Sequence, residues 1–324
     1  MLLRFVPFLA SVFLLFRPLP APAAELVLDY AYYNPLSLVL RETHGLERRL
    51  GPEVSVRWVL SAGSNKALEF LRSRSVAVTS MAGSAALLGR ANGTPLRVVY
   101  VFARAEWTAI VVPAQSPIRR LEDLKGRRVA ATPGTDPSIF LFRALARVGL
   151  DRSAVMLVPL QHQEGRLALD RGNVDAWAGL DPFMAEAELS RHDRLVFRDP
   201  SLITPGVLVT SESFASAEPE RLRLILAAYE DARHWALAHP AELTALLAKT
   251  SGLAPEVAAR QLARTDFSEP HLTAADLANL RACGEVLAAS GTLRPGADPA
   301  ALAAALPAPE FMPNPAASEP NRNP

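Results

Sequence analysis

The chain has 324 residues, of which 50% are hydrophobic and 21% are charged, and its formal net charge is +1 at pH 7. This length exceeds what one hydrophobic core usually supports, so we expect two lobes. The nearly neutral balance argues against a nucleic-acid-binding surface or a polybasic membrane surface, because both need concentrated positive charge.

The N-terminal residues have the pattern of a targeting segment. Arg4 precedes an apolar run of 12 residues, Phe5–Phe16, and an Ala-x-Ala site follows at Ala21–Ala23. The run is too short to span a bilayer, and the combination is typical of a cleavable secretory signal peptide over residues 1–23. No cysteine follows the run, so a lipid anchor is not expected. We therefore expect an exported, soluble mature protein.

Short β-branched runs alternate with helical segments along the chain, which is typical of βαβ units around mainly parallel sheets. The helix after the first strand is predicted over 34–51, and another over 163–172. From residue 219 the apolar spacing predicts helices only, and the Pro- and Asn-rich tail 307–324 is predicted to be disordered. The predicted strands are 26–31, 54–60, 76–81, 96–103, 107–113, 128–131, 155–160, 174–180, 194–200 and 206–215.

Five loops that follow strands carry small or hydroxyl residues where a helix begins. Such a helix start offers free N–H donors and the positive end of the helix dipole, so it can hold an anion without Lys or Arg. At any single loop, helix capping alone also explains these residues. For Trp177, an aromatic candidate on the strand 174–180, packing in the core is the alternative explanation. The candidate ligand-binding residues are Tyr32, Tyr33, Asn34, Gly63, Ser64, Ser80, Gly83, Ser84, Trp107, Thr132, Gly134, Thr135, Trp177, Asp181 and Phe183.

The sequence lacks the common signatures of catalytic and metal sites. It has no Gly-x-Ser-x-Gly, Gly-x-Gly-x-x-Gly, P-loop or His-Glu-x-x-His motif. Its only cysteine, Cys283, excludes an internal disulfide and lies in an apolar helical stretch, so we expect it to be buried. His162 beside Glu164 fits an acid–base pair or, more simply, a solvated loop. We expect no catalytic residue, no metal and no cofactor.

Five segments follow one another along the chain in a fixed order. They are AGSNKALEFL, GTPLRVVYVFA, SPIRRLEDLKGRRVAATPGT, NVDAWAGLDPF and WALAHPAELTALLAKTSGLAPEVA. In this order they resemble the substrate-binding proteins of bacterial ABC importers for aliphatic sulfonates, taurine and related molecules, a group that includes nitrate- and thiamine-pyrimidine-binding proteins. The resemblance covers residues 25–313.

The resemblance implies an α/β fold of the periplasmic-binding-protein type, with two lobes, two crossover hinge strands and a C-terminal helical segment. The expected lobe 1 comprises 24–103 and 206–306, and the expected lobe 2 comprises 107–200. The hinges are expected at 104–106 and 201–205, where a few residues absorb the closure. By resemblance, the protein is a periplasmic monomer that captures a small organic anion between its lobes and delivers it to an ABC permease.

The family pattern also implies roles for single residues. Asp181 and Phe183 are expected to approach the ligand, with hydroxyl donors from Ser64, Ser84, Thr132 and Thr135 and aromatic cover from Tyr32, Trp107 and Phe183. A taurine-like ligand would need a carboxylate for its ammonium, which Asp181 or Glu106 would supply. The chain departs from the family at Ser80–Ser84, Leu180 and Phe183, which leaves the ligand open. Two alternatives remain: an enzyme on the same fold that binds a pyrimidine-like molecule, or a ligand-binding signalling module.

Overall fold

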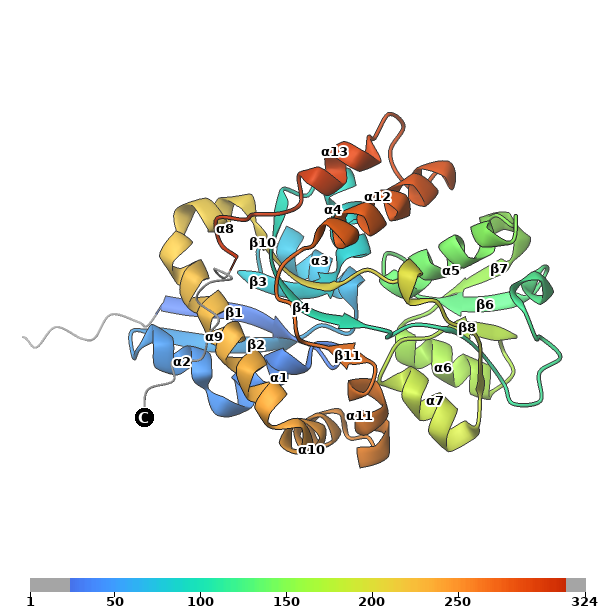
Figure 1. Cartoon of the computed structure of the whole chain (residues 1–324), viewed down its shortest axis with the longest axis horizontal. Helices are drawn as coiled ribbons and strands as arrows, with labels where there is room; N and C mark the ends of the chain where they lie inside the picture. Colours follow the sequence, from blue (N-terminus) through green and yellow to red (C-terminus); the bar gives the residue numbers. More distant parts are fainter. Residues whose placement is uncertain (1–23, 313–324) are drawn as a thin grey trace, which may run out of the picture.

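Residues 24–312 are described in the computed structural model, and they form two lobes, each built around one β-sheet (Figure 1). The predicted signal peptide, residues 1–23, and the end of the predicted tail, residues 313–324, lie outside the described residues. Between residues 24 and 312 no helix is long and apolar enough to cross a membrane.

Lobe 1 holds a six-stranded sheet in the order β11-β4-β10-β3-β1-β2. β1 pairs in parallel with β2 and β3, whereas β10 lies antiparallel between β3 and β4. The strands are β1 (Ala24–Tyr30), β2 (Val54–Leu60), β3 (Val78–Ala82), β4 (Leu96–Ala105), β10 (Gly206–Ser211) and β11 (Thr265–Asp266).

Lobe 2 holds a five-stranded sheet in the order β7-β6-β8-β5-β9. β6 pairs in parallel with β7 and β8, and β5 lies antiparallel to both β8 and β9. The strands are β5 (Ile110–Val112), β6 (Arg128–Ala131), β7 (Met156–Pro159), β8 (Ala176–Ala178) and β9 (Arg194–Phe197).

Two crossover segments join the lobes, from β4 to β5 and from β9 back to β10. β10 and β5 run antiparallel to their neighbours, so both sheets are mixed and the prediction of mainly parallel sheets is wrong. The physical reason is that the chain enters lobe 2 directly into β5 and returns to lobe 1 directly into β10, without the helical crossover that parallel pairing requires. β4 also continues through Arg104 and Ala105, which pair with β11.

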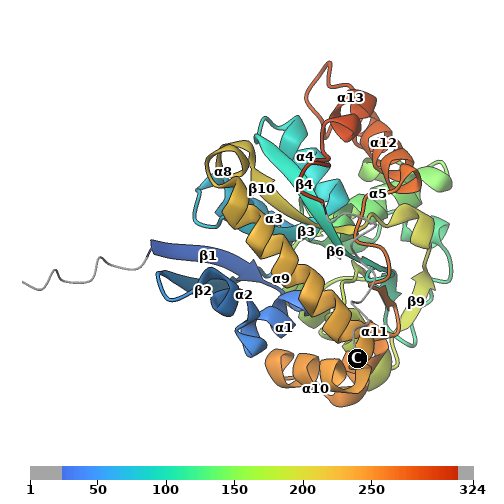
Figure 2. The ribbon, with the colours of Figure 1, turned by 60° about the vertical axis from the view of Figure 1, so that its left-hand side comes forward.

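Helices cover both sheets, and α9 is the longest of those described. Figure 2 shows α9 crossing in front of the lobe 1 sheet, where it packs against α1 and α2. The predicted helix 34–51 is two helices, because His44 takes a left-handed conformation between α1 and α2. The helices are α1 (Pro35–Thr43), α2 (Gly45–Leu50), α3 (Ser64–Arg72), α4 (Gly83–Ala91), α5 (Asp136–Arg147), α6 (His162–Asp170), α7 (Phe183–Arg191), α8 (Glu212–Ala217), α9 (Pro219–Ala238), α10 (Pro240–Ser251), α11 (Pro255–Leu262), α12 (Ala274–Ala289) and α13 (Pro299–Ala304), with single 3₁₀ turns at Leu121–Leu124, Arg152–Ala154 and Pro200–Leu202.

Two predictions for the C-terminal part are corrected. β11 interrupts the region that was predicted to be helical only. Residues 307–312 were predicted to be disordered, but Pro307 forms a bridge to Val98, and the N–H of Ala308 donates to the Val98 carbonyl. Ala308 is also buried, so this short segment is held against β4 of the lobe 1 sheet by backbone hydrogen bonds and packing.

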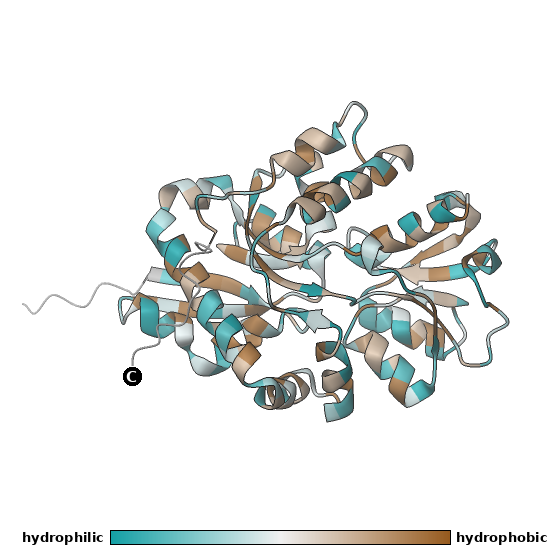
Figure 3. Cartoon of the chain, in the orientation of Figure 1, coloured by the Kyte–Doolittle hydropathy of each residue, from teal (hydrophilic) through white to brown (hydrophobic). Residues whose placement is uncertain are grey.

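The apolar core is continuous across the lobe boundary. The strands at the centre of the lobe 1 sheet are strongly hydrophobic, as their brown colour in Figure 3 shows. One buried cluster contains Tyr33 of lobe 1, Trp107 of the first crossover and Phe140 of α5 in lobe 2. A second cluster joins Ile139 of α5 to Leu280 of α12. The lobes are therefore packed together, and the structure represents a closed conformation.

Candidate functional site

A small cavity lies enclosed between the two lobes, where several of the predicted binding residues converge. Its water-accessible volume is about 10 Å³, which is room for a single water molecule. A ligand larger than water therefore needs the lobes to separate before it can enter. The lining residues are Tyr33, Ser64, Ala82, Trp107, Thr135, Asp136, Pro137, His162 and Leu180.

Two helices begin at this cavity from opposite lobes. Ser64 is the first residue of α3 in lobe 1, and Thr135 is the N-cap of α5 in lobe 2. The first N–H groups of a helix have no partner within the helix, and the helix dipole adds partial positive charge there. The cavity therefore has the backbone arrangement that binds an anionic group.

Asp136 at the start of α5 is the main polar group of the cavity, although it is not among the predicted binding residues. One carboxylate oxygen accepts hydrogen bonds from the hydroxyls of Ser84 and Thr204, and the other accepts from Trp107 Nε1 at 2.9 Å. Burial raises the pKa of this carboxyl, and the three hydrogen bonds oppose the rise. Asp136 thereby joins lobe 2 to lobe 1 through Ser84 and to both crossovers.

Three of the four expected hydroxyl donors use their protons within the protein. Thr132 donates to the Leu160 carbonyl at 2.8 Å, and Thr135 donates to the Thr132 carbonyl at 2.7 Å. Ser84 donates to Asp136. Because a hydroxyl has one proton, none of the three can also donate to a ligand in this conformation, and their expected role as donors stays a prediction.

Ser64 is the exception among the four hydroxyls. Its Oγ accepts a hydrogen bond from the N–H of Ala82 at 3.1 Å, so its own proton remains able to donate. Ser64 lines the cavity at the first turn of α3. It is therefore the one expected hydroxyl donor that is still available to a ligand in the closed form.

His162 begins α6 and is buried against the opposite lobe, not in a solvated loop and not paired with Glu164. Its Nδ1 lies 3.2 Å from Thr132 Oγ1. With the Thr132 proton given to the Leu160 carbonyl, Thr132 Oγ1 accepts from Nδ1–H, and we assign the ring hydrogen to Nδ1, which leaves Nε2 unprotonated. Burial lowers the pKa of His162 to about 3, so the ring is neutral. Nε2 is buried and has no hydrogen-bond partner among the described residues.

Two aromatic side chains close the cavity from the lobe 1 side and from the first crossover. Tyr33 and Trp107 meet edge to face, with ring centroids 6.3 Å apart and an interplanar angle of 81°. The Tyr33 hydroxyl donates to the Ser80 carbonyl at 2.9 Å. Both rings are fixed by hydrogen bonds, so they form a preorganised apolar wall for a ligand's carbon atoms.

Asn34 and Ser80 do not reach the cavity, because they hold a buried acid inside lobe 1. Asn34 Nδ2 donates to Ser80 Oγ at 2.7 Å, and the N–H of Ser80 donates to the Asp29 carboxylate at 2.9 Å. Burial raises the pKa of Asp29 to about 6. These predicted binding residues are part of the packing of lobe 1.

The buried Asp29 gives a testable pH dependence of stability. Folding raises its pKa from 3.8 to about 6, so the folded chain binds the proton more tightly than the unfolded chain. Stability from this group therefore rises as the pH falls from 7 to 4, by up to about 3 kcal/mol. Asp29→Asn cannot take up this proton, so the wild type should gain stability relative to the variant on acidification. Urea unfolding at pH 7 and pH 4.5 measures this, and a pH-independent difference would contradict it.

Other predicted residues lie near the boundary but not on the cavity. The Tyr32 carbonyl accepts a hydrogen bond from Gln261 Nε2 at 2.7 Å, and its side chain is half-buried. Gly83 donates its N–H to the Pro205 carbonyl at the second crossover. Gly134 has a φ of +76°, which favours glycine, and it faces Asn65 of lobe 1.

Trp177 and Phe183 pack inside lobe 2 and not around the cavity. Trp177 is fully buried, and a Cβ on Gly165 would lie 2.8 Å from its Nε1. Phe183 is half-buried at the start of α7 and packs against the same cluster. The predicted ligand contact of Trp177 is therefore not supported, and core packing accounts for it.

Asp181 joins the lobes instead of facing the cavity. Its carboxylate lies 3.4 Å from Arg264, which also pairs with Glu188 of α7. Burial raises the Asp181 pKa to about 6, and the Arg264 guanidinium opposes the rise. Arg260 pairs with the same Glu188 at 2.6 Å. These ion pairs connect α11 and its following turn to lobe 2. The other expected carboxylate, Glu106, pairs with Arg198.

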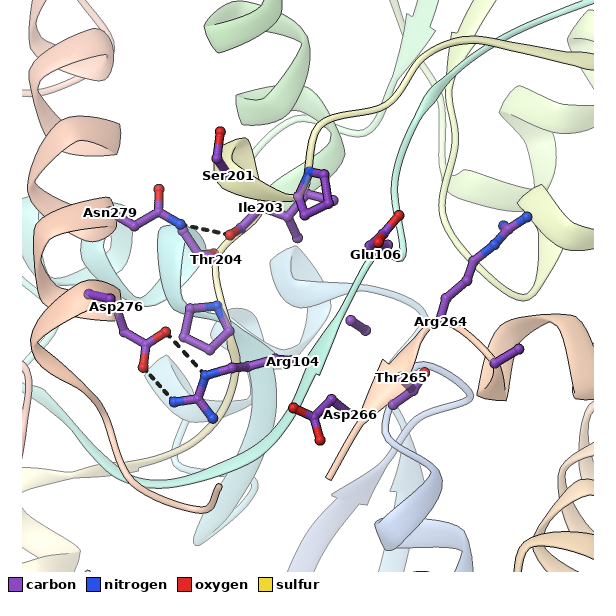
Figure 4. Close-up of a pocket in the computed structure, with 15 residues that line it drawn as sticks. Arg104, Glu106, Ser201, Ile203, Thr204, Arg264, Thr265, Asp266, Asp276 and Asn279 are labelled. Carbon is purple, nitrogen blue, oxygen red and sulfur yellow. Dashed lines mark hydrogen bonds and ion pairs between the residues drawn. The ribbon is translucent and has the colours of Figure 1, made fainter. Parts of the chain in front are cut away.

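A larger hollow of about 610 Å³ lies at the hinge, bounded by both crossovers, the α11–β11 segment and α12 (Figure 4). Arg104 at its edge is paired with Asp276, and Asn279 donates to the Ile203 carbonyl at 2.7 Å. The polar groups drawn with dashed lines in Figure 4 therefore bind one another. Thr204 lines this hollow and also donates to Asp136, so the hollow and the cavity lie against the same crossover.

Other kinds of site receive no support from the described residues. No group of three or more His, Cys, Asp or Glu side chains between residues 24 and 312 is placed to hold a metal ion. Cys283 is fully buried on α12 as predicted, and burial raises its thiol pKa to about 12. It belongs to the buried cluster that joins α12 to Ile139 of α5 and does not line the cavity.

Comparison with known proteins places this geometry in a family. The NMT1/THI5-like family profile matches residues 53–243. A putative aliphatic sulfonates-binding protein of Escherichia coli (strain K12) is 30% identical over 229 residues, which cover 70% of this chain and 72% of that protein. One of the same description from Bacillus subtilis (strain 168) is 24% identical over 237 residues, 72% of this chain and 71% of that protein.

Solved structures agree with the fold. The alkanesulfonate-binding protein SsuA from Xanthomonas axonopodis pv. citri, bound to MOPS, has a TM-score of 0.79 and 27% identity, covering 87% of this chain and 98% of that chain. The periplasmic aliphatic sulphonate binding protein SsuA from Escherichia coli has a TM-score of 0.74 and 26% identity, covering 85% and 95%. The two-lobed architecture and these similarities together show that the chain belongs to the NMT1/THI5-like family and has the periplasmic-binding-protein fold.

Proposed function

We propose that this chain is the solute-binding component of an ABC importer. In this proposal it is exported to the periplasm, acts as a monomer, captures a small molecule bearing a sulfonate-like acidic group, and delivers it to a permease. Its ligand lies between the lobes at the first turns of α3 and α5, with Ser64 as a hydroxyl donor and with Tyr33 and Trp107 against the carbon atoms.

The observation that carries this proposal is the convergence of two helix N-termini from opposite lobes on one enclosed cavity. An anion placed there is desolvated when the lobes close, which strengthens each charge-assisted hydrogen bond to about 1.5–3 kcal/mol. Relatives of this chain are described as sulfonate-binding proteins, which supports the same ligand chemistry.

A binding role fits the cavity better than a catalytic one. The described lining contains no Cys or Lys, and the neutral His162 is hydrogen-bonded to Thr132 and not to an acid. A desulfurization enzyme has the same fold with a TM-score of 0.64 and 18% identity, covering 89% of this chain and 97% of that chain. At that identity the likeness concerns the fold alone. We therefore propose that the chain is not an enzyme.

Ser64→Ala tests the proposed donor. We expect the substitution to weaken binding of short sulfonates by about 10-fold, because one charge-assisted hydrogen bond is lost. The thermal midpoint without ligand should fall by a few degrees, because the buried N–H of Ala82 loses its acceptor. Isothermal titration of the chain without residues 1–23 measures the affinity.

The ligand panel for this test contains short alkanesulfonates, 2-aminoethanesulfonate, sulfate, nitrate and pyrimidine precursors. Binding of a sulfonate that Ser64→Ala weakens would support the proposal. Binding of none of the sulfonates, or of a pyrimidine precursor only, would refute it. Equal sulfonate affinity in wild type and Ser64→Ala would remove Ser64 from the site.

A further inference from the structure

The charged side chain of the cavity is an acid, although the proposed ligand is an anion. No Lys or Arg side chain is among the described residues that line the cavity. Asp136 is only 2% exposed and is the first residue of α5, so it lies beside the N–H groups proposed to bind the ligand. Two negative charges enclosed together repel each other strongly, because little water is present to screen them. The carboxylate and a bound anion therefore cannot share the closed cavity at low cost.

The Asp136 carboxylate already has the hydrogen-bond donors that an anionic ligand would need. One of its oxygens accepts from the hydroxyls of Ser84 and Thr204. The other oxygen accepts from the indole N–H of Trp107 at 2.9 Å. All three donors are neutral, and such donors suit a sulfonate oxygen as well as a carboxylate oxygen. Ser84 and Trp107 are themselves among the residues that the sequence predicts to bind the ligand.

These donors belong to parts of the chain that change position relative to Asp136 when the lobes separate. Ser84 lies on α4 of lobe 1, and Trp107 and Thr204 lie on the two crossovers, whereas Asp136 belongs to lobe 2. Thr204 Oγ1 also accepts from the N–H of Ser84 at 2.9 Å, so these two donors are held together on the lobe 1 side. A hydrogen bond is lost at a donor–acceptor distance of about 3.6 Å. The three hydrogen bonds therefore stabilise a closed conformation that contains no ligand.

We propose that these three hydrogen bonds, which we call the Asp136 latch, close a share of the ligand-free molecules, and that the ligand's acidic group must displace the carboxylate to bind. This inference rests on the proposed function and adds a control of affinity at the same site. A latched molecule does not admit ligand, so the latch lowers the apparent affinity in proportion to the fraction of molecules that it closes. Only an anion that competes with the carboxylate for these donors is then captured.

Asp136→Ala removes the carboxylate and frees its three donors. Without ligand, small-angle scattering at pH 7.5 should give a larger radius of gyration for this variant than for the wild type, because no molecule is latched. With propane-1-sulfonate, isothermal titration should show at least about 10-fold tighter binding, because the negative charge beside the ligand's acidic group is gone. Removing a residue that only stabilises the closed form would weaken binding, so tighter binding is specific to competition.

Asp193→Ala is the matched control, because it removes another buried acid of lobe 2 that does not line the cavity. It should match the wild type in both measurements. Thr204 tests the latch from outside the cavity, since it lines the hinge hollow instead. Thr204→Val removes one hydroxyl donor and should be more extended than the wild type without ligand, whereas Thr204→Ser keeps the hydroxyl and should match the wild type.

Two results would overturn the inference while the proposed function stands. One is an equal ligand-free radius of gyration in the wild type and Asp136→Ala or, should that variant not fold, in the wild type and Thr204→Val. The other is a wild type that binds propane-1-sulfonate as tightly as Asp136→Ala or more tightly. If neither chain binds any sulfonate, the proposed function itself fails, and the competition fails with it.

Discussion

Arg264→Ala is expected to weaken ligand binding by about 100-fold. Arg264 is 6% exposed and pairs with Asp181, which is 1% exposed, and with Glu188. Removing one partner of a buried ion pair leaves the other charge uncompensated, at a cost of about 3–5 kcal/mol. Protonation of Asp181 relieves part of that cost, so about 2–3 kcal/mol should remain, which corresponds to about two orders of magnitude.

The loss of affinity should arise because the closed conformation becomes less stable. Arg264 follows α11 on lobe 1, whereas Asp181 and Glu188 belong to lobe 2, so these ion pairs form only when the lobes are closed. Isothermal titration with a bound sulfonate measures it. Arg260→Ala is the matched control, since Arg260 pairs with the same Glu188 but is 40% exposed. An exposed pair contributes at most about 1 kcal/mol, so the control should lose at most about 5-fold. Equal losses in the two variants would contradict a role for the buried pair.

The same account predicts a pH dependence for the Arg264→Ala defect. The pKa of Asp181 in the folded chain is about 6, so at pH 5 the carboxyl is mostly neutral and its attraction to Arg264 is largely lost. The difference in affinity between wild type and variant should therefore be smaller at pH 5 than at pH 7.5. An unchanged difference would assign the effect to Glu188 instead.

Gly63→Leu is expected to prevent closure and to reduce binding by about 100-fold or more, because the added side chain overlaps the opposite lobe. A Cβ at this position would already lie 3.0 Å from His162 Nε2 and 3.2 Å from Cδ2. The backbone of Gly63 is extended, with φ 167° and ψ 166°, which a leucine adopts without strain. Within lobe 1 the added Cβ would lie 3.0 Å from Oδ1 of Asn65, the end of a side chain that can shift. The variant should keep its thermal midpoint without ligand to within a few degrees.

Small-angle scattering with and without ligand separates closure from affinity. The wild type should become more compact on binding, whereas Gly63→Leu should not. Ala62→Leu provides the control, because Ala62 is exposed one residue earlier and should tolerate the same side chain. Wild-type affinity in Gly63→Leu would show that these lobe surfaces do not meet in the bound state.

Local sequence patterns were sufficient to predict the strands that lead into the cavity. The alternating β-branched runs gave β2 and β6 with the observed bounds, Val54–Leu60 and Arg128–Ala131. Hydroxyl residues after strands pointed to Ser64 and Thr135, because the ends of neighbouring strands and the helices that follow them meet at one edge of a sheet. The structure places both of these residues on the cavity.

The residues that give the cavity its charge could not be predicted in this way. In the sequence, Asp136 resembles any acidic residue in the first turn of a helix. It becomes a buried acceptor only through hydrogen bonds from Ser84 and Thr204, which lie 52 and 68 residues away along the chain. The tautomer of His162 depends on Thr132, 30 residues earlier. An Asp directly after a small-residue loop was the available signal, and it was equally consistent with helix capping.

The surroundings of other residues depend on distant contacts in the same way. The period-two pattern placed Trp177 on one face of its strand but did not say whether that face meets the cavity or the core of lobe 2. Asp181 was expected at the ligand, yet its partner Arg264 lies 83 residues further along the chain. Residues 307–312 lack periodicity, and only their pairing with Val98 orders them.

The most direct test of the central claim is a crystal structure of the chain without residues 1–23, grown with 2-aminoethanesulfonate. We predict closed lobes with the sulfonate oxygens at the first turns of α3 and α5, within hydrogen-bond distance of Ser64 Oγ. Ligand density in the hinge hollow beside Arg104, or closed lobes with no ligand density between them, would contradict it.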